Sequence, residues 1–242
     1  MTTPIWLWIL LGIWALLLFG GAVLGRWNAD RTHRMPTWAR MASSLTLVLL
    51  AWLLYLHGRG GTNETYGLLI AIGMTCGFVG DLFMARLLPV REPVLGGMAA
   101  FALGHVIYIA AVLQVGEELA LTAQAPRIGA WLALLIVGAL CWYAVVWRGA
   151  AAGQRSALHL AALPYALLLA STAGFALGLA LQHGVFLPLA VGGLLFLISD
   201  LLLAAQLFNG LHFSGIGDVV WLTYGPAQML IVTSVLAAAS CG

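Results

Sequence analysis

The sequence contains little charge, and this scarcity decides the class of protein. Only 7% of its 242 residues are charged and 63% are hydrophobic, a composition far from that of soluble domains. It has no lysine, and its formal net charge of +2 comes from ten arginines and eight acidic residues. So small a charge argues against nucleic acid as a partner. We therefore expect an integral membrane protein.

Cysteine is also scarce, and no two cysteines have the spacing of a redox or zinc motif. Cys76, Cys141 and Cys241 are isolated in apolar surroundings without a Cys-x-x-Cys pattern. Their isolation argues against a disulfide framework or a zinc knuckle, and we expect all three to be buried and inert. The first apolar run lacks a preceding basic segment and is too long for a signal peptide, so we expect it to be a retained span.

Long apolar runs fill most of the chain. About 20 such residues are needed to cross the hydrocarbon of a bilayer, and the sequence supplies eight runs joined by short connections. The predicted fold class is therefore all-α, a polytopic membrane protein forming a single integral domain over residues 1–242. The expected spans are 5–25, 38–57, 66–86, 94–115, 128–147, 158–181, 186–208 and 217–238.

The arginines are divided unevenly between the two ends of these spans. Arg59 and Arg127 lie at one end, and eight others lie at or beside the loops that follow odd-numbered spans. Cytoplasmic loops are enriched in basic residues, so we expect the arginine-rich end in the cytoplasm of a bacterial inner membrane, with both termini outside. The eight are Arg26, Arg31, Arg34, Arg40, Arg86, Arg91, Arg148 and Arg155.

Two carboxylates, Asp81 and Asp200, fall inside predicted spans. An ionisable residue there costs a few kcal/mol or more, so each is a candidate functional residue. Gly73 and Gly77 precede Asp81 at intervals of four residues, and small residues on one helical face let a neighbouring helix approach closely. Asp81 should therefore face protein. A rise of about 1.5 Å per residue places both carboxylates in the cytoplasmic half of the bilayer.

A weak internal repeat relates the two carboxylates. His105 follows Asp81 by 24 residues, and Tyr224 follows Asp200 by 24 residues, each on the next predicted span. Spans one to four and five to eight would then be two parallel four-helix repeats about an axis along the membrane normal.

Three kinds of chemistry suit this arrangement. Two close carboxylates can share a proton and supply an acid and a base. A transporter or lipid-binding protein could instead use them to carry protons or bind a cation. A metal-dependent hydrolase is the third alternative, but no His-Glu-x-x-His pattern supports it, and we expect no metal or other cofactor. In the metal-dependent alternative, the metal ligands would be Asp81, His105, Asp200 and either His212 or Asp218.

Several ordered motifs carry a resemblance to a known family. They are Gly77-Phe-Val-Gly80-Asp81, the stripe Gly97, Phe101, His105 and Tyr108, the segment Phe196-x2-Ser199-Asp200-x3-Ala204, and Tyr224-x2-Ala227-Gln228. Together they resemble the YhhN family, which includes the transmembrane lysoplasmalogenases. The resemblance implies an eight-helix membrane enzyme that cleaves the vinyl ether bond of a lysoplasmalogen within the bilayer, releasing a fatty aldehyde and glycerophosphoethanolamine or glycerophosphocholine.

The resemblance also assigns residues. Asp81 and Asp200 match the family's motif aspartates, and we expect Asp200 to be the acid and Asp81 the base. The positions matching the family's surrounding polar residues are His105, Tyr108, Ser199, Tyr224 and Gln228. Three further binding candidates come from the sequence itself. Tyr165 follows a proline within a span, and Arg86 and Arg91 are candidate ligands for a lipid phosphate.

Overall fold

The computed structural model describes residues 4–150 and 155–241, and every element of regular secondary structure within them is a helix. Eight helical segments are long and apolar enough to cross a membrane, which confirms the predicted class of polytopic membrane protein. Two spans change from α-helix to π-helix along their length. The elements are α1 (Ile5–Ala15), η1 (Leu16–Gly20), α2 (Gly21–Leu24), α3 (Thr37–His57), α4 (Glu64–Met84), α5 (Pro93–Glu118), α6 (Gln124–Cys141), η2 (Trp142–Trp147), α7 (Ala157–Gln182), η3 (Gly184–Phe186), α8 (Leu187–Asn209) and α9 (Ile216–Ala239).

The ends of the helices follow local backbone chemistry. Pro93 opens α5, where a missing N–H costs nothing because no intrahelical partner exists. Gly210 ends α8 in the left-handed conformation with a φ of 63°, which suits a residue without a Cβ. The α4 helix ends at Met84, two residues before the predicted end, so Arg86 lies in the following turn with a φ of 56°.

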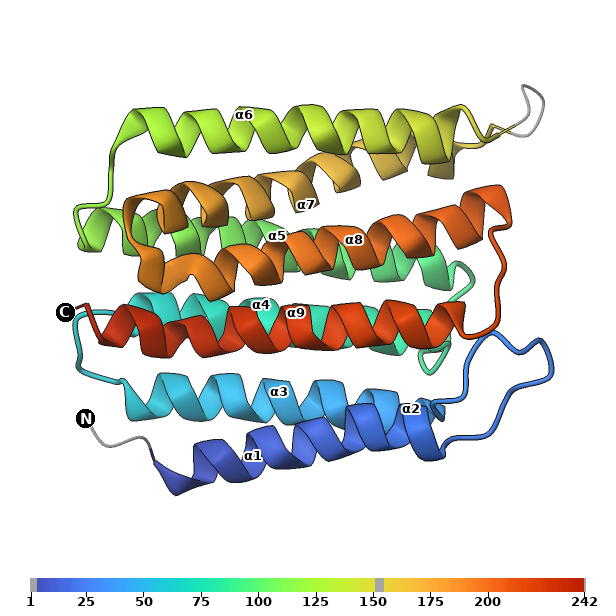
Figure 1. The fold of residues 1–242 in the computed structure, drawn as a ribbon, viewed down its shortest axis with the longest axis horizontal. Helices are drawn as coiled ribbons and strands as arrows, with labels where there is room; N and C mark the ends of the chain where they lie inside the picture. The colour runs from blue at the N-terminus through green and yellow to red at the C-terminus, as the bar shows by residue number, and fades with distance from the viewer. Residues whose placement is uncertain (1–3, 151–154, 242) are drawn as a thin grey trace.

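The helices form an antiparallel bundle with an approximate twofold axis along its length. Figure 1 shows α6 and α7 at the top, α3 and α1 at the bottom, and α8 and α9 in front of α5 and α4. Half a turn about the long axis exchanges α1 with α6, α3 with α7, α4 with α8, and α5 with α9. The contacts between the halves obey the same rule, because α3 packs against α9 and α7 packs against α5.

Glycine allows the central helices to approach closely. A Cβ atom added at Gly104 on α5 would lie 3.1 Å from the carbonyl oxygen of Gly73 on α4. A Cβ added at Gly193 on α8 would lie 2.9 Å from the Cα of Ala173 on α7. Such contacts give helices in a bilayer their packing energy, since lipid supplies no hydrophobic drive between them.

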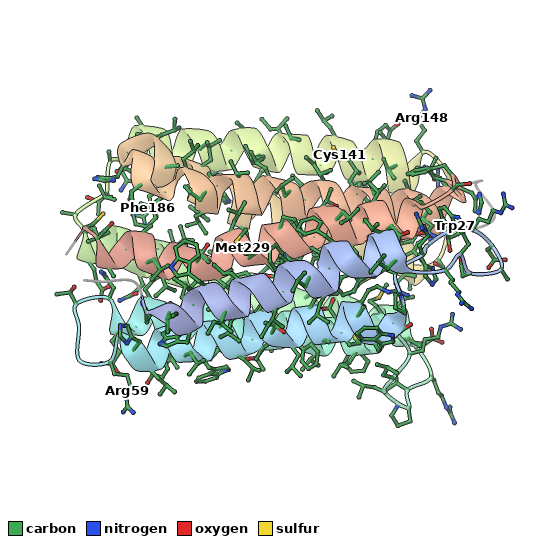
Figure 2. The ribbon with its side chains drawn as sticks, turned by 60° about the horizontal axis from the view of Figure 1, so that its bottom comes forward. Trp27, Arg59, Cys141, Arg148, Phe186 and Met229 are labelled. Carbon is green, nitrogen blue, oxygen red and sulfur yellow. The ribbon has the colours of Figure 1, made fainter. Side chains whose placement is uncertain are left out.

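The two ends of the bundle differ in charge. The loops after α2 and α4 lie at one end, together with Trp27 and Arg148, whereas Arg59 lies at the other (Figure 2). The first helix begins and the last helix ends at that other end (Figure 1). The uneven distribution of arginine along the sequence is therefore an uneven distribution in space, with most of the guanidinium groups at one face of the membrane domain.

Candidate functional site

Asp81 lies on the last turn of α4 and is almost fully enclosed by neighbouring helices. Its side chain is 3% exposed. The Oδ2 atom accepts a hydrogen bond of 2.5 Å from the hydroxyl of Ser44 on α3 and one of 3.0 Å from the hydroxyl of Tyr224 on α9. Three helices therefore fix the position of this carboxylate.

Asp200 occupies the corresponding position on α8. Its Oδ2 atom accepts a hydrogen bond from the hydroxyl of Tyr165 on α7. The pair Tyr165 and Asp200 joins α7 to α8 in the same way that Ser44 and Asp81 join α3 to α4. The approximate twofold axis of the bundle thus extends to the hydrogen bonds of its two central carboxylates.

Both carboxylates line one polar cavity of about 560 Å³. Its walls come from the loop between α2 and α3 and from α3, α4, α5, α8 and α9, so it lies toward the arginine-rich end. It has this lining: Asn28, Asp30, Thr32, His33, Arg40, Met41, Asp81, Met84, Ala85, Arg86, Phe101, Ser199, Asp200, Leu203, Gln206, Gly217, Val220, Trp221 and Tyr224.

A second, apolar cavity adjoins the polar one. It measures about 80 Å³ and is lined by residues of α4, α5, α6, η2, α7 and α8, including Met98, Cys141 and Ala166. Tyr165 also lines it. Four residues line both cavities, so the two spaces meet there: Met84, Phe101, Asp200 and Leu203. Asp200 consequently lies at the boundary between the polar cavity and the apolar cavity.

Three predicted binding residues form a chain of hydrogen bonds that runs from the interior of the bundle to the cavity wall. Tyr108 donates to Oε1 of Gln228 at 2.8 Å, and Nε2 of Gln228 donates to the hydroxyl of Tyr224 at 3.2 Å. Tyr224 in turn donates to Asp81. Tyr224 is thus the member that reaches the cavity, while Tyr108 and Gln228 orient it from within the bundle.

His105 is buried away from both cavities. Its Nδ1 atom lies 3.0 Å from Oγ1 of Thr172, and its ring packs edge-on against Phe196 with centroids 4.5 Å apart. Its Nε2 atom has no hydrogen-bond partner. These contacts join α5 to α7 and α8, so His105 packs at the interface between the two halves, and its role in substrate binding stays a prediction.

The remaining predicted residues differ in whether they line a cavity. Arg86 lines the polar cavity, as does Ser199, whose hydroxyl donates to the carbonyl of Val220 at 3.1 Å. Arg91 is exposed in the loop before α5 and lines neither cavity, so its contact with a phosphate stays a prediction.

The three cysteines differ in exposure. Cys76 and Cys141 are half-buried and Cys241 is exposed, so the expectation that all three are buried is wrong.

The metal-ligand set considered from the sequence is not brought together. Asp218 accepts hydrogen bonds of 2.6 Å and 3.0 Å from the backbone amides of Arg34 and Met35, which ties the loop between α2 and α3 to α9. His212 contacts the carbonyl of Asp30 at the surface. Within residues 4–150 and 155–241, no group of three or more such side chains has a geometry that could hold a metal ion.

Sequence reasoning missed several residues of the site. Ser44 and Arg40 both lie within the predicted span 38–57, where the Ser43-Ser44 pair and the charge of Arg40 are the available signals. His33 also lines the cavity. Burial, and next the charge of Arg40, lower the pKa of His33, while Asp218 and Asp30 act in the opposite direction.

Comparison with known proteins gives one match. The sequence model of the YhhN family matches residues 36–235, which is most of the chain. No curated protein and no solved structure matches the chain. The matched residues run from the start of α3 into α9 and so include both aspartates, Ser44, Tyr165 and Tyr224.

Proposed function

Because the chain belongs to the YhhN family, we propose that it is an ether hydrolase that cleaves the vinyl ether bond of a lysoplasmalogen. The products are a fatty aldehyde and glycerophosphoethanolamine or glycerophosphocholine. One observation carries the proposal: two carboxylates face a polar cavity, and one of them also borders an apolar cavity inside the bundle.

The two adjoining cavities suit an amphiphilic substrate. A lysoplasmalogen has a polar glycerophospho group and one long alkenyl chain, joined by the vinyl ether. The head group would occupy the polar cavity and the chain would follow the apolar cavity between α5, α6, α7 and α8. The reacting bond would then lie near Asp200, where the two cavities meet.

The two aspartates can supply the chemistry. In its protonated form, Asp200 gives a proton to the β-carbon of the vinyl ether, and the α-carbon becomes part of an oxocarbenium ion. Asp81 takes a proton from a water molecule as that water adds to the α-carbon, which yields a hemiacetal. The hemiacetal collapses to an aldehyde as its hydroxyl proton passes to Asp200 and Asp81 gives its proton to the leaving glycerol oxygen. One water is consumed, and both aspartates return to their starting protonation states. A nearby ionised carboxylate also stabilises the cation.

Hydrogen bonds around Asp81 suit a base held in fixed geometry. Ser44 and Tyr224 bind the same oxygen, Oδ2. The chain from Tyr108 through Gln228 restrains Tyr224. Fixed donors of this kind hold a catalytic group in position without reorganisation during the reaction.

The membrane orientation belongs to the same proposal. The arginine-rich end, toward which the polar cavity lies, faces the cytoplasm of a bacterial inner membrane, and both termini lie outside. The active site would then draw its water and release its polar product on the cytoplasmic side.

A transporter or lipid-binding protein is the second candidate function, and the twofold arrangement of the carboxylates favours it. Parallel repeats with carboxylates at their interface also occur in proteins that move protons or cations. The two functions differ in what they need. A hydrolase releases aldehyde in detergent, whereas a transporter requires a sealed vesicle and a gradient.

The deciding experiment measures aldehyde release from a synthetic alkenyl lysophosphatidylethanolamine by purified protein in detergent. Asp81→Asn and Asp200→Asn are compared with Glu118→Gln, which alters an exposed carboxylate at the opposite end of the bundle. We expect each aspartate variant to lose activity by about a hundredfold to ten-thousandfold, with Glu118→Gln unchanged. Full activity in either aspartate variant would overturn the acid–base pair, and loss of activity with a chelator would replace it with a metal site.

A further inference from the structure

A guanidinium group without a carboxylate partner lines the polar cavity. Arg40 lies on the first turn of α3, and its Nε atom is buried with no hydrogen-bond partner. Its one side-chain hydrogen bond runs from Nη2 to Oγ1 of Thr37 at 3.4 Å, and its guanidinium also lies 5.9 Å from the ring centroid of Trp221. Within the described residues, the two ion pairs join Arg59 to Glu64 and Arg127 to Glu117.

Two carboxylates near Arg40 accept hydrogen bonds from other donors. Asp218 accepts the backbone amides of Arg34 and Met35, and Asp81 accepts the hydroxyls of Ser44 and Tyr224. Arg40 is half-buried, and although Asp218 and Asp81 lie near enough to act on its charge, neither forms an ion pair with its guanidinium. Removing such a charge from water costs several kcal/mol unless an anion compensates it. The unused donors point to an anionic ligand in the cavity.

A second guanidinium group reaches the same cavity from a different element. Arg86 follows α4 and has a φ of 56°, a backbone conformation that costs a non-glycine residue roughly 1 kcal/mol. In this conformation the chain turns back at Leu87, whose amide donates to the carbonyl of Leu82. Arg86 thus lines the cavity from the α4 side while Arg40 lines it from the α3 side.

We propose that Arg40 and Arg86 form a phosphate-binding subsite, which makes the enzyme selective for ether lipids whose glycerol carries a phosphate. This inference rests on the proposed hydrolase function and deepens it. Two guanidinium groups on separate elements suit a tetrahedral group with several acceptor oxygens, because each planar fork can donate two parallel hydrogen bonds. The subsite lies on the same cavity as Asp81 and Asp200, as a head group attached to the reacting chain requires.

The kinetic test compares two substrates that differ only in the phosphate. These are alkenyl lysophosphatidylethanolamine and the alkenylglycerol that lacks the phosphoethanolamine. Arg40→Gln and Arg86→Gln are measured beside Arg91→Gln, a control that removes a neighbouring arginine lining neither cavity. Each subsite variant should raise KM for the phosphate-bearing substrate by about tenfold to a hundredfold, with little change in kcat. All three variants should leave KM for alkenylglycerol unchanged.

A binding test separates failure of the subsite from failure of the hydrolase proposal. The probe is the alkyl-ether analogue of the lysophospholipid, which has no vinyl ether to cleave, and its affinity for detergent-solubilised protein is measured by calorimetry. Weaker binding to Arg40→Gln and Arg86→Gln would support the subsite even if the wild type released no aldehyde. Inorganic phosphate is tested as a competitor, since competition at millimolar concentration would make free phosphate the ligand and overturn selectivity for a lipid head group.

Two outcomes would overturn the subsite. One is equal KM and affinity in Arg40→Gln, Arg86→Gln and Arg91→Gln. The other is an equal loss on both substrates, which would indicate a role in folding. Because Arg86 is exposed, Arg86→Gln keeps the test open if Arg40→Gln fails to fold. Arg40→Lys retains the positive charge but lacks the paired planar donors of a guanidinium group, so it should bind the analogue with intermediate affinity.

Discussion

The hydroxyl of Ser44 on α3 donates a hydrogen bond of 2.5 Å to Oδ2 of Asp81 on α4. Tyr165 on α7 has the same relation to Asp200 on α8. Each half of the bundle therefore places a carboxylate on its third span and a hydroxyl donor on its second.

Ser44→Ala tests whether this hydrogen bond serves the reaction. Removing a donor from a charged acceptor costs about 1.5–3 kcal/mol, so we expect kcat for aldehyde release to fall by about tenfold or more with little change in KM. The matched control is Ser43→Ala, since the Ser43 hydroxyl is also buried but donates to the carbonyl of Arg40. Equal kcat values for the two variants would show that the contact with Asp81 is structural.

The apolar cavity should limit the length of the alkenyl chain. Cys141 on α6 lines this cavity, whereas its neighbour Leu140 is 62% exposed on the outer surface of the helix. Cys141→Phe should fill part of the space and shift kcat/KM in favour of shorter chains, by about tenfold for a loss of two methylene groups. Leu140→Phe should leave the chain-length profile unchanged. A profile that is the same in both variants would place the chain elsewhere.

Helix packing at Gly73 should not tolerate a methyl group. A Cβ there would lie 2.4 Å from Cε1 of Tyr108, so Gly73→Ala must displace the tyrosine. We expect a loss of about 1–3 kcal/mol in the free energy of unfolding, measured as a lower Tm in detergent. Gly129→Ala is the control, since nothing lies within 4 Å of its added Cβ. Equal Tm values would mean that α4 and α5 can separate at no cost.

His33 should make the protein less stable in acid. Its pKa is lowered from 6.5 in the folded protein by burial and by Arg40, against the opposing charges of Asp218 and Asp30. Between the lowered and ordinary pKa values the unfolded chain binds more protons, so the free energy of unfolding falls as pH decreases through this window. Between about pH 8 and about pH 5, the Tm of His33→Gln should fall less than the Tm of the wild type. Parallel losses would show that other groups control the acid transition.

The sequence is sufficient to predict the eight spans and the two central carboxylates. Long apolar runs specify membrane helices because every backbone polar group must be satisfied within the bilayer. An aspartate in such a run is conspicuous because its burial is costly. The α4 and α8 helices therefore appear where the apolar runs predict them, and Asp81 faces protein as its neighbouring glycines indicate.

The partners of the carboxylates could not be predicted in the same way. Which face of α3 meets α4 depends on packing between helices that are apolar on all sides, so nothing local distinguishes Ser44 from Ser43. The difference between Arg86 and Arg91 depends on where α4 ends and on the left-handed turn that follows. The predicted span ran to residue 86, and an error of two residues at a helix end changes which arginine reaches the cavity.

The approximate twofold axis has a consequence for the direction of the proposed reaction. In two identical halves the carboxylates would have identical surroundings, and both would have the same affinity for a proton. The halves differ: two hydroxyls bind Asp81, whereas one tyrosine binds Asp200, which also borders the apolar cavity. Because the two environments differ, the aspartates can take different roles. One gives its proton to the substrate, and the other takes a proton from water.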